Sequence, residues 1–337
     1  MPEENLSLTE NTQTDDRLVW LDLLRIAASL LIVMLNLTAA QLKTMPLGAA
    51  DWQTVNLYLA LARSATPLFT MMSGVLFLGL GKQRSLEQLL KGPVKKLVVI
   101  YLFWSLLYAV FTVFTQPTPL TAALIPSLIK LTLAGSDHMW FLPILICLYL
   151  ISPFLQQILD HSDSSIWKYG VLLMALGLLG HTLLMGADFL SFGGLLQTIL
   201  YKFPLGHVIF FAGYFLLGNF LRQYTQPNAL VAKLAVLAMV IGVLANAGLT
   251  YFASKQTGST NLTLSLPLSI MTFMIAVPIF WLFQGPVSQV KVSAQAGQTI
   301  ATIARQTLGV YLIHPMVFFG LDKLAHFTPL SFNPLFS

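Results

Sequence analysis

The stretch LVWLDLLRIAASLLIVMLNLTAAQL, residues 18–42, decides the fold of this chain. It has the length that a helix needs to cross a bilayer, roughly 20 apolar residues, yet it contains Asp22, Arg25, Ser29 and Asn36. At about 100° per residue, these four positions form one polar stripe on an apolar helix. Because ionisable groups at membrane depth usually face a cavity, a partner or a substrate path, we interpret the stripe as the wall of a site. Arg25 and Asn36 lie about 16 Å apart along the helix axis, so one can sit near a membrane face and the other deep inside.

Composition places the rest of the chain in the membrane as well. Of its 337 residues, 56% are hydrophobic and only 9% are charged, and the mean hydropathy is +0.76; soluble proteins have about 25% charged residues. We therefore expect an all-α membrane protein, a bundle of about ten transmembrane helices. The apolar segments after the first are 55–80, 95–115, 121–134, 139–159, 166–186, 203–222, 229–252, 262–283 and 299–321. Segment 121–134 is short and contains Lys130, which favours a re-entrant or tilted path.

The basic segment GKQRSLEQLLKGPVKK, residues 81–96, sets the expected orientation. Positive charge gathers on the cytoplasmic side of membrane proteins, so this loop is placed in the cytoplasm, and an even number of spans puts both termini there. The predicted organisation is a polar tail at 1–17, a bundle at 18–321 and a tail at 322–337, in a multi-pass protein of the plasma membrane. The acidic start lacks the basic n-region of a cleaved signal peptide. Clustering of basic residues beside the membrane also argues against nucleic-acid binding, despite a net charge of +5.

Several polar side chains inside the spans have two readings. Arg63 could clamp a phosphate or carboxylate, although snorkelling to the interface competes. His138 could carry a proton near neutral pH, or be structural, and the nearby Trp140 is typical of a membrane interface. In the last span, Arg305 and His314 lie about half a turn out of phase and do not share a face. Cys147 is the only cysteine in the sequence, so an internal disulfide and a cysteine metal cluster are excluded, and we expect Cys147 to be a packing residue.

No HExxH, P-loop, GxSxG or dinucleotide-binding motif is present in the sequence. An enzyme built on this chain would have to bring isolated His, Arg, Asp and Ser residues together by helix packing. The sequence also predicts no metal site.

Six segments together resemble the large family of membrane acyltransferases called acyltransferase type three. They are LDLLRIAASLLIVMLN in the first span, PLFTMMSGVLFL in the second, the basic run before YLFWSLLY, HMWFLPILICLYLISPF, GYFLLGN and LGVYLIHP in the last. Each is weak alone, but their order and spacing are specific. The resemblance implies a bundle of about ten helices that takes an acyl group, usually acetyl, from acyl-coenzyme A on the cytoplasmic side. The group passes to a hydroxyl, commonly on a bacterial cell-envelope glycan.

The family has an arginine followed eleven positions later by a histidine in its first span; here these positions are Arg25 and Asn36. A histidine there removes the proton of the attacking alcohol, and an amide cannot do so usefully. General-base catalysis contributes roughly 10² to 10⁴ in rate, so Asn36 predicts an impaired O-acetyltransferase unless His138 or another base substitutes. Three accounts stay open: a deliberate change from histidine that traps a bound donor, which we favour, a natural relative that has lost transfer, or a relative with another base.

The resemblance also implies which residues hold the donor. The phosphates of acetyl-coenzyme A or another acyl-coenzyme A would be attracted by positive side chains, and the expected donor-binding residues are Arg25, Arg63, Ser73, Lys95 and Lys96.

Asp22 is expected to orient Arg25 through a contact one helical turn away, and Trp140, Tyr311 and His314 are expected supporting residues.

The rival function is a transporter or flippase without covalent chemistry, because a polar stripe can also line a translocation path. The identity of the acceptor and the oligomeric state, a homodimer included, stay open at this point.

Overall fold

The computed structural model describes residues 18–79, 85–115, 124–160, 164–186, 207–226 and 228–325. These ranges contain helices and no strand, which confirms the predicted all-α class. The predicted tail at 1–17 lies outside the described residues, as do residues 81–84 of the basic loop and 326–337 of the second tail. The last described helix continues to Ala325, so it extends past the predicted end of the bundle at residue 321.

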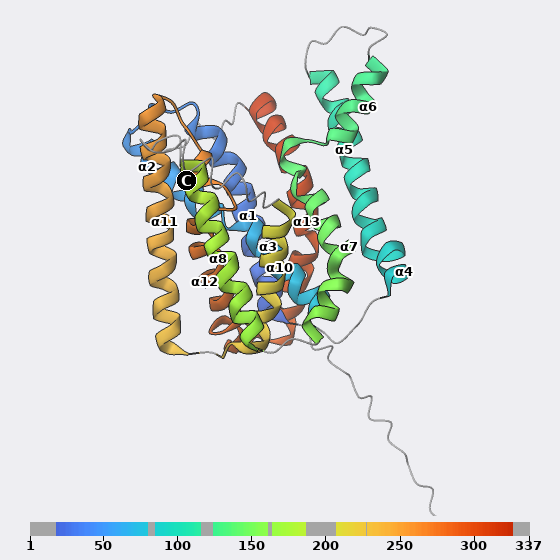
Figure 1. Ribbon diagram of the computed structural model, residues 1–337. Coiled ribbons are helices and arrows are strands. Elements are labelled where there is room, and N and C mark those ends of the chain that lie inside the picture. The colour runs from blue at the N-terminus through green and yellow to red at the C-terminus, as the bar shows by residue number, and fades with distance from the viewer. Residues whose placement is uncertain are drawn as a thin grey trace, which may run out of the picture.

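Each of the ten predicted apolar segments contains a helix. The α-helices are α1 (Val19–Leu42), α2 (Ala50–Ala62), α3 (Ala65–Leu78), α4 (Leu86–Leu89), α5 (Lys95–Thr115), α6 (Leu124–Ala134), α7 (Phe141–Asp160), α8 (Ser164–Gly186), α10 (His207–Tyr224), α11 (Ala229–Thr257), α12 (Ile270–Gln284) and α13 (Ala294–Ala325). Short helical turns connect some of them: η1 (Leu90–Val94), η2 (Asp137–Met139), η4 (Thr263–Ser265) and η5 (Val287–Gln289). Figure 1 shows most of these helices side by side in one bundle, with α5 and α6 at its edge.

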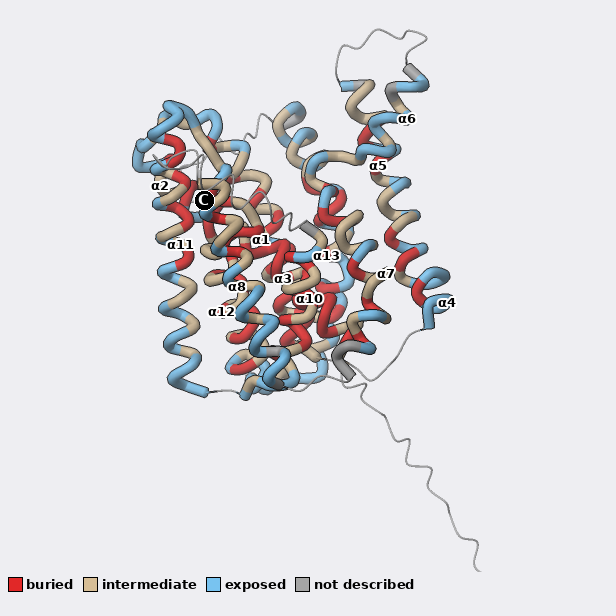
Figure 2. Tube along the Cα trace, in the orientation of Figure 1, coloured by how far each residue is buried: buried red, intermediate tan, exposed pale blue. Residues whose placement is uncertain are grey.

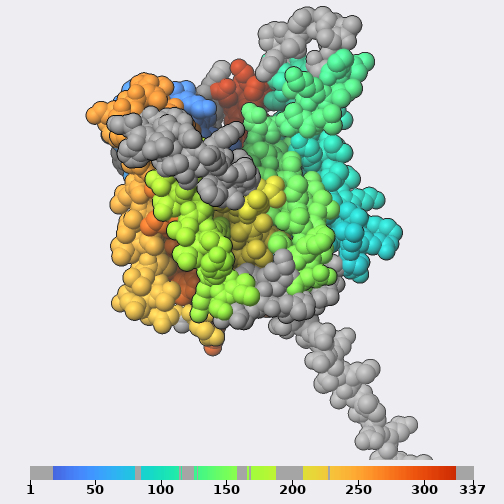
Figure 3. All heavy atoms as spheres, in the orientation of Figure 1, coloured from blue at the N-terminus to red at the C-terminus, as the bar shows by residue number. Residues whose placement is uncertain are grey.

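The described helices have the character of a multi-pass membrane protein. Six are long and apolar enough to cross a membrane, or seven if one bent pair is counted as a single span. The predicted number of ten spans is therefore not confirmed. Figure 3 shows α8 and α11 on the outer face, and both carry exposed apolar side chains, such as Leu172 and Leu176 on α8 and Leu237 and Leu244 on α11. Such surfaces are suited to contact with lipid.

The bent pair includes the segment whose path was in question. Leu128–Met139 and Phe141–Gln157 meet at 90°, across a break at Trp140. Segment 121–134 is thus joined to α7 by a bend of the kind found in a broken span or a re-entrant loop. In Figure 1, α1 starts at the lower end of the bundle and α13 finishes at the upper end. The expectation that both termini lie on one side of the membrane is therefore not confirmed.

Two glycines let α3 and α10 approach closely at the centre of the bundle. A Cβ atom on Gly74 would overlap the carbonyl oxygen of Phe215, and one on Gly218 would overlap that of Met71. Small residues permit such backbone contact between membrane helices. Figure 2 shows that buried residues gather in α1, α3 and α10. Helix α1 packs against α2, α3, α12 and α13, and Asp22 and Ser29 of its polar stripe are buried.

Candidate functional site

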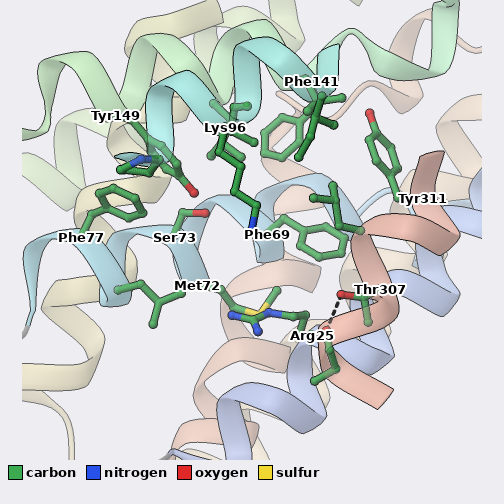
Figure 4. A pocket seen from close by; sticks show the side chains of 18 of the residues that line it. Arg25, Phe69, Met72, Ser73, Phe77, Lys96, Phe141, Tyr149, Thr307 and Tyr311 are labelled. Atoms are coloured by element: carbon green, nitrogen blue, oxygen red, sulfur yellow. Dashed lines mark hydrogen bonds between the residues drawn. The ribbon is translucent and has the colours of Figure 1, made fainter. Parts of the chain in front are cut away.

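Two cavities lie along α1. The first has a volume of about 600 Å³ and is bordered by α1, α3, η1, α5, α7 and α13. Three positively charged side chains line it, namely Arg25 of α1, Lys96 of α5 and Arg305 of α13, and we call it the cationic cavity. Figure 4 shows Lys96 and Arg25 entering it from different walls. No aspartate or glutamate is among the described residues that line it.

The charges of the cationic cavity are only partly balanced. Arg25 Nη1 lies 3.5 Å from Asp22 Oδ1, which is the contact predicted from their spacing. Arg305 donates a hydrogen bond of 3.0 Å to the neutral hydroxyl of Thr302. The lining therefore holds three cations with one neighbouring carboxylate, and its electrostatic character suits a ligand with several negative charges.

The rest of the lining is mostly apolar and aromatic. Phe77 and Tyr149 stack with ring centroids 3.7 Å apart, and Phe141 and Tyr311 add further rings. Ser73 contributes a hydroxyl, whereas the hydroxyl of Thr307 is bonded to the Ala304 carbonyl, as the dashed line in Figure 4 marks. A mainly apolar pocket with a few convergent polar groups is the usual form of a small-molecule site.

Arg63 and Lys95, two of the expected donor-binding residues, do not line this cavity. Lys95 is exposed beside Lys96. Arg63 ends α2, and its buried Nε has no hydrogen-bond partner among the described residues. Arg305 was noticed in the sequence but given no role there. Arg305 lines the same cavity as Arg25 because α13 packs on α1, which helical periodicity does not reveal.

The second cavity has a volume of about 480 Å³ and lies farther along α1 and α13. We call it the histidine cavity, because His138 of η2 and His314 of α13 line it together with Asn36. The two imidazole rings are edge to face with centroids 5.5 Å apart. The remaining lining residues are Leu37, Ala40, Gln41, Thr44, Ser136, Asp137, Pro315 and Phe318.

The polar stripe of α1 is divided between the two cavities. Arg25 lines the cationic cavity and Asn36 lines the histidine cavity. Tyr311 forms part of the wall between them. Its ring lines the cationic cavity, while the rings of His138 and His314 lie 5.9 and 6.5 Å away on the other side.

Trp140 and Cys147 are among the lining residues of neither cavity. Trp140 is 39% exposed and packs its ring against those of Phe141 and Phe211, with centroids 6.1 and 5.9 Å away. Cys147 is exposed on α7, so its expected packing role is not confirmed. Among the residues that the structure describes, no three His, Cys, Asp or Glu side chains come together as a metal site.

The fold and the two cavities define a multi-pass membrane protein with a cationic small-molecule pocket next to a second pocket that contains two histidines. A family model described as an acyltransferase domain matches residues 18–336. The chain therefore belongs to the acyltransferase 3 family, whose members are membrane acyltransferases and act on an acyl donor and an acceptor. Comparisons with curated proteins and with solved structures give no match.

Proposed function

We propose that the protein transfers an acyl group, acetyl in the first instance, from acyl-coenzyme A to a hydroxyl of a cell-envelope glycan. The observation that carries the proposal is the convergence of Arg25, Lys96 and Arg305 on one cavity. Coenzyme A bears a diphosphate and a 3′-phosphate, and guanidinium and ammonium groups are the side chains that bind phosphates. The aromatic lining offers apolar contact to the adenine ring and the pantetheine arm.

The donor enters from the cytoplasm in this proposal. Pro93 and Lys96 of the cationic cavity belong to the basic segment 81–96, which the positive-inside rule assigns to the cytoplasmic face. The acyl end of the donor then points along α1 towards Tyr311. This direction leads from the cationic cavity to the histidine cavity.

The histidine cavity receives the acceptor. Its lining combines amide, hydroxyl, carboxylate and imidazole groups with the ring of Phe318. Hydrogen-bonding side chains around one aromatic ring suit a hydroxyl-rich molecule such as a sugar. Asn36 cannot act as a useful base, but two imidazoles lie in the same cavity. Their position supports the third account of Asn36, in which another base serves the reaction.

The first test follows the covalent fate of the donor. Membranes containing the protein are incubated with acetyl-coenzyme A labelled in the acetyl group, and label is measured in the lipid-linked and polymeric glycan. Membranes lacking the protein are the control. The proposal expects label bonded to glycan; label that crosses the membrane unbonded would instead indicate the rival function of a transporter or flippase.

The second test concerns donor binding alone. A ligand that binds only the folded protein stabilises it, by about 2.7 kcal/mol at a concentration 100 times its dissociation constant. Thermal stability of the purified protein should rise with acetyl-coenzyme A and much less with acetyl-pantetheine, which lacks the adenosine phosphates. Equal stabilisation by both compounds would contradict a role for the cationic cavity in phosphate binding.

A further inference from the structure

The reaction proposed above needs a group that removes a proton from the acceptor hydroxyl, and the inference that follows rests on that function. Asn36 lines the acceptor side, but its amide Nδ2 donates a hydrogen bond of 2.9 Å to the Ile32 carbonyl in its own helix. An amide nitrogen has no lone pair available for a proton. The groups of this lining that can accept a proton are the Asp137 carboxylate and the two imidazoles, and imidazole is the commonest general base in enzymes.

Pro315 determines which nitrogen of His314 carries the proton. Proline has no backbone N–H, so inside a helix the carbonyl four residues earlier loses its donor. Here that carbonyl belongs to Tyr311, because Pro315 lies within α13. His314 Nδ1 is 2.9 Å from this carbonyl oxygen. A carbonyl only accepts, so Nδ1 carries the hydrogen and Nε2 presents a lone pair.

The Nε2 atom of His314 has a lone pair that could accept a proton, and no hydrogen bond to the described residues occupies it. The His314 side chain lines the histidine cavity although the residue is only 4% exposed. Its Nε2 is buried and has no hydrogen-bond partner among the described residues. Buried polar atoms without a partner are uncommon in folded proteins and require an explanation. A hydroxyl group of a bound acceptor would provide the missing partner.

The neighbours of His314 hold it beside the wall between the cavities. Tyr108 of α5 donates a hydrogen bond of 2.8 Å to the Leu312 carbonyl, which ties this part of α13 to α5. The ring of Tyr311, which faces the cationic cavity, has its centroid 6.5 Å from that of His314. A donor whose acyl end reaches Tyr311 thus ends about one aromatic ring away from His314.

We propose that His314 is the general base of acyl transfer in this protein and that its Nε2 takes the proton of the acceptor hydroxyl. The acceptor oxygen then forms a bond to the acyl carbon, and the bond from that carbon to the coenzyme A sulfur breaks. The proton on Nε2 passes to the departing thiolate, which leaves as the free thiol. The products are an O-acylated acceptor and coenzyme A, and His314 returns to its starting form.

The test compares transfer of labelled acetyl to glycan by the wild-type protein and by the His314→Gln variant in membranes. General-base catalysis contributes roughly 10² to 10⁴ in rate, so the variant should lose at least about 100-fold. His181→Gln is the matched control, because His181 of α8 lines neither cavity. Stabilisation by acetyl-coenzyme A should be unchanged in His314→Gln, which shows that the variant is folded and binds donor.

A second variant separates loss of the base from structural damage. In the double variant Asn36→His with His314→Gln, an imidazole returns to the same cavity from α1, and transfer should recover at least about tenfold over His314→Gln. If the wild-type protein transfers label and His314→Gln transfers it within about threefold of that rate, the inference fails and the proposed function stands. If the wild-type protein binds donor but transfers no label, the proposed function fails and the inference with it.

Discussion

The Tyr311 hydroxyl donates a hydrogen bond of 2.6 Å to the backbone carbonyl of His138. This bond joins α13 to η2 at the wall between the cationic cavity and the histidine cavity. It also fixes the Tyr311 ring against the two histidines. The boundary between the two cavities is therefore built by residues that are distant in the sequence.

Replacing Tyr311 by phenylalanine tests this boundary. Tyr311→Phe leaves the His138 carbonyl without this donor, so the free energy of unfolding should fall by about 1 kcal/mol. The thermal unfolding midpoint of the purified protein measures the effect. Tyr224→Phe is the control, since Tyr224 lies at the end of α10 and is 45% exposed. Equal midpoints for both variants would contradict a stabilising role of the bond.

Lys96 and its neighbour Lys95 form a matched pair for donor binding. Lys96 lines the cationic cavity and Lys95 does not, so Lys96→Gln should weaken binding of acetyl-coenzyme A about tenfold, or about 1.4 kcal/mol, while Lys95→Gln should have little effect. Isothermal titration calorimetry at several salt concentrations measures the dissociation constant of acetyl-coenzyme A for each purified variant. The salt dependence of binding should be smaller for Lys96→Gln. Identical losses in the two variants would indicate a general surface charge effect.

Gly218 should tolerate no larger side chain. Gly218→Ala places a Cβ against the Met71 carbonyl, so α3 and α10 must move apart, at a cost of about 1–3 kcal/mol for overpacking. Gly248→Ala in α11 is the control, because its Cβ meets no atom within 4 Å and alanine favours a helix. The thermal unfolding midpoint should therefore fall for Gly218→Ala and stay level or rise for Gly248→Ala.

Asn36→His alone distinguishes the accounts of the first-span position. With His314 as base, a second imidazole in the histidine cavity should change the rate of label transfer by less than about tenfold. A gain within the range of general-base catalysis, roughly 10² to 10⁴, would show instead that the chain with Asn36 lacks a base. The rate per unit of folded protein in membranes is the measurement.

Pro315→Ala tests the orientation of the imidazole. Alanine supplies a backbone N–H to the Tyr311 carbonyl and competes with His314 Nδ1, so the fixed tautomer is lost. Transfer should fall by about tenfold while the helix stays intact, because alanine suits a helix interior. An unchanged rate with unchanged stability would show that Pro315 does not orient His314.

The sequence by itself determined the helical class, the membrane character and the approximate position of most helices, although segment 55–80 is two helices, α2 and α3, and α4 lies in the predicted loop. These properties follow from local composition, since a run of apolar residues with helical spacing needs no distant partner to be recognised. The contact between Asp22 and Arg25 was also predictable, because it lies within one turn of one helix.

Tertiary structure alone decided how the site is divided. The stripe on α1 gave no sign that Tyr311 and His138 would separate Arg25 from Asn36, or that Arg305 would join Arg25. The 90° bend between Leu128–Met139 and Phe141–Gln157 is likewise a feature of the tertiary structure. The physical reason is that helical periodicity fixes where side chains lie around one axis, whereas cavities arise from the packing of several axes, which depends on contacts between residues far apart in the chain.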